Sequence, residues 1–254
     1  MTTVVYDGSF EGLLSAVFEI YEHGFKDVEL AAEGRLQHAI FGDQYSVTTN
    51  EANAARVWKG FKAKASSNAV TQVYRSWLAE LPGMDNTIYS YMRYAFDSKL
   101  NMEKDFTHPA VLRIADTAKK VHREKHRMEA FIRFELTADQ LYFAIIEPDF
   151  NVLPLIKPHF ESRYADQRWM IYDARRRFGL YYDLQKVETV QVAFDSETST
   201  GRNIAAVYDE KEALYQKLWQ NYFSSINIKS RRNMKLHIQH MPLRYWKYLT
   251  EKKG

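Results

Sequence analysis

Apolar residues recur with the three-to-four-residue period of a helix over most of the first half of the chain. A short apolar run at 4–6 predicts a strand, and the stripe that follows it from 10 to 23 predicts a helix. Asp7 or Ser9 could cap the start of this helix, because both residue types accept hydrogen bonds from unpaired backbone N–H groups. Weak alternation at 27–32 predicts a second strand.

Over most of the stretch from 50 to 97, apolar residues recur at helical spacing. Leu81-Pro82-Gly83 interrupts it, since proline and glycine end helices, and we expect three helices that form a helical subdomain over 50–105. His108-Pro109 then begins a longer helix that runs through Val121.

Beyond this helix the apolar period changes from 3.6 to 2, which is typical of strands. The runs 131–136 and 141–146 flank a polar turn and predict a β-hairpin. A second hairpin is predicted from 169–173 and 179–182, which flank three consecutive arginines.

Other segments complete the pattern: a helix over 153–164, a strand over 190–194, a polar loop over 195–203 and a helix over 209–223. Strands and helices thus occur in separate blocks. The sequence therefore predicts an α+β fold in a single domain, 1–254, with a mainly antiparallel sheet, helices packed on it and a helical insertion.

Composition narrows the class of protein. Hydrophobic residues make up 46% of the chain and charged residues 26%, which is ordinary for a globular protein. The chain has no cysteine, and this excludes disulfides, thiolate catalysis and cysteine-ligated zinc. No apolar run is long enough to span a membrane, and the start shows no secretory signal. We expect a cytoplasmic protein that has no cofactor and does not bind a membrane.

Positive charge is concentrated at the C-terminal end. Residues 229–254 hold eight Lys/Arg and one acid, a local net charge of +7 in a chain of +3. Cations suit phosphates, and flat rings suit bases. The candidate nucleic-acid-binding residues here are Arg231, Arg232, Asn233, Arg244, Tyr245 and Trp246. The alternative is an amphipathic terminal helix with its rings in the core and its lysines in solvent.

A second candidate site lies at 121–127. On a helix His122 and His126 are one turn apart and could face one ligand, whereas Glu124 points elsewhere. Many neighbouring lysines and arginines argue against a metal ion, for which only His159 offers a distant third ligand. The histidines and Arg127 could instead contact phosphate, or simply complement the dipole at a helix C-terminus.

The third candidate site is the tip of the second hairpin. Arg175, Arg176 and Arg177 would project in different directions there and reach backbone phosphates, unless the turn serves only solubility. Asp173 could orient one arginine or act as a base. The catalytic candidates are therefore His122, Glu124, His126 and Asp173, acting as acids or bases.

Four sequence blocks, taken together, resemble a known family. They are 6–14 (YDGSFEGLL), 121–127 (VHREKHR), 158–160 (PHF) with 169–173 (WMIYD), and 231–233 (RRN) with 241–247 (MPLRYWK). The chain resembles a bacterial family of uncharacterised proteins assigned to DNA metabolism, in its stand-alone form. Some relatives are fused to a uracil-DNA glycosylase-like domain. The resemblance implies a DNA-repair context and a radical S-adenosylmethionine protein as partner, without an established reaction.

Three functions follow as hypotheses. The first is an accessory DNA-binding protein that presents nucleic acid to the radical S-adenosylmethionine partner. The second is a DNA-processing enzyme, glycosylase- or nuclease-like, that uses the cluster of His122, Glu124 and His126 together with Asp173. The third is a protein-interaction module without affinity for DNA.

Overall fold

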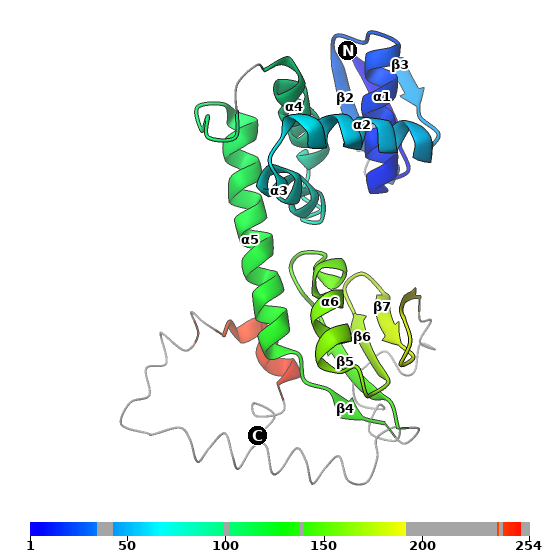
Figure 1. Ribbon diagram of the computed structural model, residues 1–254, viewed down its shortest axis with the longest axis vertical. Helices are drawn as coiled ribbons and strands as arrows, with labels where there is room; N and C mark the ends of the chain where they lie inside the picture. Colours follow the sequence, from blue (N-terminus) through cyan, green and yellow to red (C-terminus); the bar gives the residue numbers. More distant parts are fainter. Residues whose placement is uncertain (35–42, 99–101, 138–139, 192–237, 239–240, 250–254) are drawn as a thin grey trace. The chain divides into compact units, whose positions relative to one another are not determined.

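The computed structural model describes most of the chain, namely residues 1–34, 43–98, 102–137, 140–191, 238 and 241–249. Two compact units, Met1–His122 and Arg123–Gly254, divide within helix α5 (Pro109–Phe131) (Figure 1). Both contain helices and strands, so the fold is α+β. The prediction that 1–254 fold as a single domain stays a prediction.

The first unit is built on a three-stranded parallel sheet. Its strands β1 (Thr2–Tyr6), β2 (Val28–Ala32) and β3 (Asp43–Ser46) lie in the order β2-β1-β3. Helix α1 (Phe10–Glu22) connects β1 to β2 and packs against β1 with its apolar side. The chain therefore returns to the start of the sheet before β2 begins, and the two strands run parallel.

In the turn from β1 into α1, Ser9 is the cap, one of the two residues predicted for this role. The Ser9 hydroxyl accepts a hydrogen bond from the Gly12 backbone N–H at 2.8 Å, and Asp7 accepts bonds from Ser9 and, at 2.7 Å, from the Thr49 hydroxyl. Burial raises the pKa of Asp7, but the hydrogen bonds from Ser9 and Thr49 outweigh it and hold this pKa below its ordinary value. Gly8, with φ of +84°, permits the sharp turn.

Three further helices complete this unit, as predicted for 50–97. They are α2 (Glu51–Lys64), α3 (Ser67–Trp77) and α4 (Met84–Asp97). Their apolar sides share one hydrophobic core with β1 and α1. The Asn86 side chain of α4 bonds both the N–H and the carbonyl of Leu30 on β2, at 2.8 and 3.0 Å, and so fixes α4 against the sheet.

The second unit is built on a mixed sheet with the strand order β4-β5-β6-β7-β8. The strands are β4 (Glu135–Leu136), β5 (Tyr142–Ile146), β6 (Trp169–Asp173), β7 (Phe178–Tyr182) and β8 (Val187–Val190). Both predicted hairpins, β4–β5 and β6–β7, are confirmed. The first strand is shorter than expected, since α5 continues through Phe131 and residues 132–134 belong to neither a helix nor a strand.

The prediction of a mainly antiparallel sheet was wrong. The sheet of the first unit is entirely parallel, and in the second unit β5 pairs with β6 in parallel. Helix α6 (Leu153–Arg163) connects β5 to β6 and lies against the sheet (Figure 1). A helix between two neighbouring strands makes them parallel, and the sequence contains two such strand–helix–strand units.

Aromatic packing holds α6 on the second sheet. Trp169 of β6 is fully buried, and Phe160 of α6 meets it edge-on with ring centroids 6.1 Å apart. Phe134 and Tyr182 extend this cluster on either side. The predicted loop over 195–203 and helix over 209–223 lie outside the described residues, as does most of the predicted strand over 190–194.

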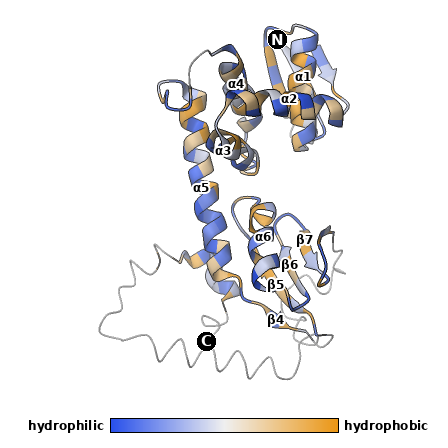
Figure 2. Ribbon diagram, in the orientation of Figure 1, coloured by the Kyte–Doolittle hydropathy of each residue, from blue (hydrophilic) through white to orange (hydrophobic). Residues whose placement is uncertain are grey.

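Helix α5 crosses the boundary between the two units and is coloured hydrophilic along much of its length in Figure 2. None of the helices within the described residues combines the length and apolar character that a membrane crossing requires.

We predict opposite effects from alanine at two helical glycines. A Cβ at Gly12 would overlap the Asp7 carboxylate and come within 2.9 Å of the Ser9 and Thr49 hydroxyl oxygens, so the cap must open. Gly12→Ala should lower the free energy of unfolding by about 1 kcal/mol, although alanine favours a helix over glycine by about that amount. Urea denaturation measures the change.

The matched control is Gly60 of α2, which is exposed and whose added Cβ would approach only the Phe96 ring, at 3.8 Å. Gly60→Ala should raise the free energy of unfolding by up to about 1 kcal/mol. Equal changes in the two variants would show that the cap does not constrain Gly12.

Candidate functional site

The carboxyl ends of β5 and β6 meet at one edge of the second sheet. The two strands are parallel and Ile146 pairs with Asp173, so the loop after β5 and the turn after β6 leave the sheet side by side. Loops at the carboxyl ends of parallel strands commonly form ligand sites. Most of the predicted site residues that the structure describes gather at this edge.

The turn after β6 is organised by Asp173. Its side chain is fully buried and accepts hydrogen bonds from the backbone N–H groups of Arg175 and Arg176, at 2.9 and 3.2 Å. The Arg176 guanidinium donates to the same carboxylate at 3.0 Å. Burial raises the pKa of Asp173, and the bonds from Arg176 and Arg175 oppose that rise. Arg176 therefore points inward, whereas Arg175 and Arg177 are exposed.

Glu124 of α5 is the second buried carboxylate, with 1% of its surface exposed. One oxygen accepts the Asp149 backbone N–H at 2.9 Å. The other accepts the Tyr245 hydroxyl at 2.5 Å and the Arg244 guanidinium at 3.0 Å, with Arg127 3.8 Å away. Glu124 thus ties α5 to the loop after β5 and to the 3-10 helix η3 (Leu243–Tyr248).

Asp149 joins these two carboxylates into one network. Its carboxylate binds Arg244 at 2.7 Å, and its backbone carbonyl accepts bonds from Arg175 and Arg176, both at 3.2 Å. We call this network the arginine edge. Its members are Arg127, Arg175, Arg176 and Arg244 with Glu124, Asp149 and Asp173. Three of the guanidinium groups therefore meet three carboxylates, whereas that of Arg175 donates to the Asp149 carbonyl, and the seven residues come from four parts of the chain.

The segment η3 is fastened at a second point. Glu147 accepts a hydrogen bond from the Tyr248 hydroxyl at 2.7 Å and pairs with Lys247. Tyr245 is buried, and its ring lies 6.2 Å from that of Phe131. The Trp246 ring is half-buried and donates to the Met241 carbonyl at 3.0 Å. Two alternatives were open for Tyr245, stacking on a base and burial in the core, and the structure shows its ring buried.

The two histidines of α5 point away from Glu124. His122 and His126 are exposed, whereas Glu124 between them is buried. At about 100° per residue each lies about 160° around the helix from Glu124. The structure therefore does not bring the two histidines together with Glu124 or Asp173. Arg231, Arg232 and Asn233 lie outside the described residues.

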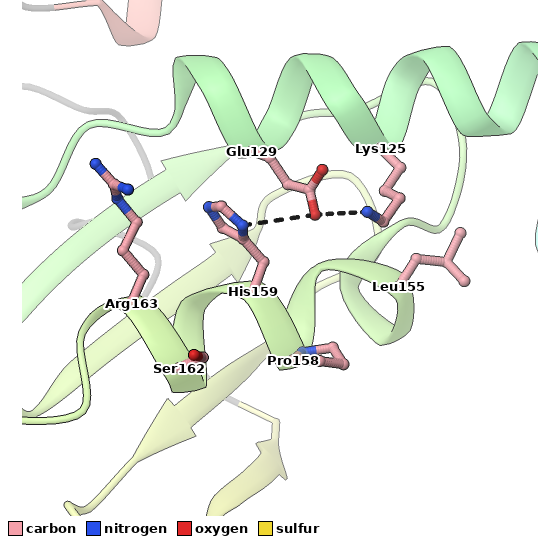
Figure 3. Close-up of a pocket in the computed structure, with 7 residues that line it drawn as sticks. All are labelled: Lys125, Glu129, Leu155, Pro158, His159, Ser162 and Arg163. Carbon is pink, nitrogen blue, oxygen red and sulfur yellow. Dashed lines mark hydrogen bonds and ion pairs between the residues drawn. The ribbon is translucent and has the colours of Figure 1, made fainter.

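The sequence reasoning missed a groove between α5 and α6. It has a volume of about 650 Å³. Its lining residues are Lys125, Glu129, Leu155, Pro158, His159, Ser162 and Arg163 (Figure 3). Lys125 binds Glu129 at 2.6 Å, and the His159 Nδ1 lies 3.9 Å from the same carboxylate.

A signal for this groove was present in the sequence. Lys125 and Glu129 are four residues apart on α5, and His159 and Arg163 are four residues apart on α6, so each pair lies on one helix face. Nothing in the sequence indicated that these two faces meet.

Comparison with known proteins shows which family the chain belongs to. A family model described as a domain of unknown function, DUF4130, matches residues 82–251, about two thirds of the chain. The chain belongs to this family. No curated protein matches its sequence. The match fits the expected resemblance to uncharacterised proteins, while DNA metabolism and the radical S-adenosylmethionine partner stay predictions.

Removing the hydroxyl of Tyr245 tests the buried network. Tyr245→Phe leaves the ring in place but removes one of the bonds to the Glu124 carboxylate. A hydrogen bond to a charged group contributes about 1.5–3 kcal/mol, so we expect the free energy of unfolding to fall by about that amount. Urea denaturation measures it.

The control is Tyr181→Phe, because the Tyr181 ring is half-buried and its hydroxyl has no hydrogen-bond partner among the residues described. It should change the free energy of unfolding by less than about 0.5 kcal/mol. The same small change in Tyr245→Phe would mean that the bond to Glu124 contributes nothing.

Acid should weaken the attachment of η3. The hydrogen bonds from Lys247 and Tyr248 hold the pKa of Glu147 below its ordinary value. A carboxylate with a lowered pKa in the folded state stabilises the fold above its unfolded pKa, about 4.3, and loses this effect as the pH falls through the folded value. Glu147→Gln should therefore be less stable than the wild type at pH 7, and the difference should shrink below about pH 4.3. A difference that persists at low pH would contradict this account.

Proposed function

We propose that the second unit binds the phosphate backbone of DNA and acts as an accessory protein that presents DNA to a partner enzyme. One observation carries the proposal. Arginines from the start of the unit, from the turn after β6 and from η3 converge at one edge of a sheet. Guanidinium groups bind phosphate through paired hydrogen bonds, and several within one site give backbone affinity.

The distribution of charge along the sequence also favours the second unit as the part that binds DNA. Residues 123–254 contain 22 Lys/Arg and 17 Asp/Glu, a net charge of +5. Residues 1–122 contain 13 and 15, a net charge of −2. A polyanion is therefore attracted to the second unit and mainly to residues 229–254, which alone carry a net charge of +7.

The cations at this edge of the sheet are those of the arginine edge together with Arg177 and Lys247, and they form two groups. Some stabilise the structure through buried partners, and the others are exposed to solvent. Arg176 is 9% exposed and paired with Asp173, so its charge serves the turn. Arg175 and Arg177 are exposed on that turn. Lys247 and Arg244, with side chains 58% and 40% exposed, add charge from η3. We assign backbone contact mainly to Arg175 and Arg177.

The partner enzyme of the proposal is a radical S-adenosylmethionine protein, and this part rests on the family resemblance alone. A separate catalytic function is not favoured. Glu124 and Asp173, the buried acid candidates, already accept hydrogen bonds from internal partners, so neither is directed at a substrate.

We predict that Arg175→Ala/Arg177→Ala weakens DNA binding. Fluorescence anisotropy with a labelled oligonucleotide, single-stranded and duplex, should show lower affinity in both forms. The slope of log affinity against log salt should flatten by about two units, one for each lost phosphate contact.

The matched control is Arg56→Ala/Arg93→Ala, which removes two exposed arginines from the first unit and changes the net charge equally. Its affinity and salt slope should stay near those of the wild type. An equal loss in both double variants would show that net charge alone governs binding. Wild-type protein without DNA affinity would contradict the proposed function.

A further inference from the structure

Three side chains of the first unit direct their polar atoms at one point. Glu19 lies in the last turns of α1, His23 ends that helix, and Tyr45 lies on β3. The Glu19 Oε2 is 3.1 Å from the His23 Nε2 and 3.0 Å from the Tyr45 hydroxyl oxygen. The hydroxyl oxygen is 2.9 Å from the His23 Nε2. The three atoms therefore form a nearly equilateral triangle.

Hydrogen bonds hold this triangle together. The Tyr45 hydroxyl donates to the Glu19 carboxylate, and a proton on the His23 Nε2 can be shared between the Glu19 and Tyr45 oxygens. Once these two protons are lost, all three atoms present lone pairs to the same point, and a cation could take the place of the protons.

The triangle has the size of one face of a metal coordination sphere. Zinc binds histidine nitrogen and carboxylate oxygen at about 2.0–2.1 Å, in tetrahedral geometry. An ion at that distance from all three atoms would lie about 1.1 Å above their plane. Only small side-chain shifts would be needed to open the triangle to the ligand spacing of a tetrahedral site.

The surroundings hold these ligands in place and favour a cation. The His23 ring stacks on Phe25, with centroids 5.5 Å apart, and Phe25 meets the Tyr45 ring at 5.3 Å, so one apolar side chain supports both rings. The C-terminal end of a helix attracts positive charge, and the first unit is acidic overall. The side chain of His23 is 46% exposed and that of Glu19 24%, which leaves access from solvent.

We propose that Glu19, His23 and Tyr45 form a binding site for a divalent transition-metal ion of the zinc class, with water as the fourth ligand. The described residues contain no group of three His, Asp or Glu placed to hold a metal ion. The proposed site is not a group of that kind, because its third ligand is the phenol oxygen of Tyr45. Nitrogen and oxygen donors of this kind suit zinc and neighbouring metals. The proposal is independent of DNA binding by the second unit.

Metal titration of the full-length protein tests the site. After treatment with a chelator, isothermal titration with Zn²⁺ should show one equivalent bound. Glu19→Gln, His23→Gln and Tyr45→Phe should each weaken binding at least tenfold. Co²⁺ gives a second measurement, since its visible absorption reports a tetrahedral environment that each variant should lose.

Two controls separate this site from other ligands and from misfolding. His126→Gln removes an exposed histidine of α5 and should bind Zn²⁺ like the wild type. Tyr45→Phe keeps the ring against Phe25, and circular dichroism should confirm its fold. The proposal is overturned if wild type does not bind, or if the three ligand variants bind as tightly as His126→Gln.

Discussion

The second unit depends on burying one carboxylate, that of Glu124. An ionised group costs several kcal/mol to remove from water unless hydrogen bonds replace its hydration. Glu124 obtains these bonds from the Asp149 backbone, the Tyr245 hydroxyl and the Arg244 guanidinium. The end of α5, the loop after β5 and η3 must therefore meet at one place. Buried ion pairs are weak evidence for stability, and the clearer consequence here is a unique position for η3.

The sequence allowed much of the fold to be predicted. Periodicity located α1, α5 and both hairpins, and residue type gave Asp7 and Ser9 as the two candidate caps, of which the structure shows Ser9. Strand direction was predicted wrongly, because a period of two shows which residues share a face but not which strands are neighbours. The helix predicted between 146 and 169 already implied a parallel pair, since a crossover of that length joins parallel strands.

The candidate site was less predictable for a physical reason. The sequence analysis named Arg175, Arg244 and Glu124 as candidate site residues. Whether each is buried or exposed depends on contacts between distant segments of the chain. Glu124 and Tyr245 are 121 residues apart in sequence and share a hydrogen bond. Local pattern could suggest that Tyr245 is an exposed stacking ring or a core residue, and only the fold decides for the core.

Some cations of the second unit are needed by buried carboxylates, and this limits which of them can bind a polyanion. If Arg244 turned to a phosphate, Glu124 would lose a partner while remaining 1% exposed. Removing one member of a buried pair costs about 3–5 kcal/mol, and less here because the Arg244 side chain is 40% exposed and Tyr245 remains bonded. Arg175 and Arg177 carry no such penalty, since neither pairs with a buried carboxylate through its guanidinium among the contacts described. A count of basic residues therefore overstates the charge that the arginine edge can offer to DNA.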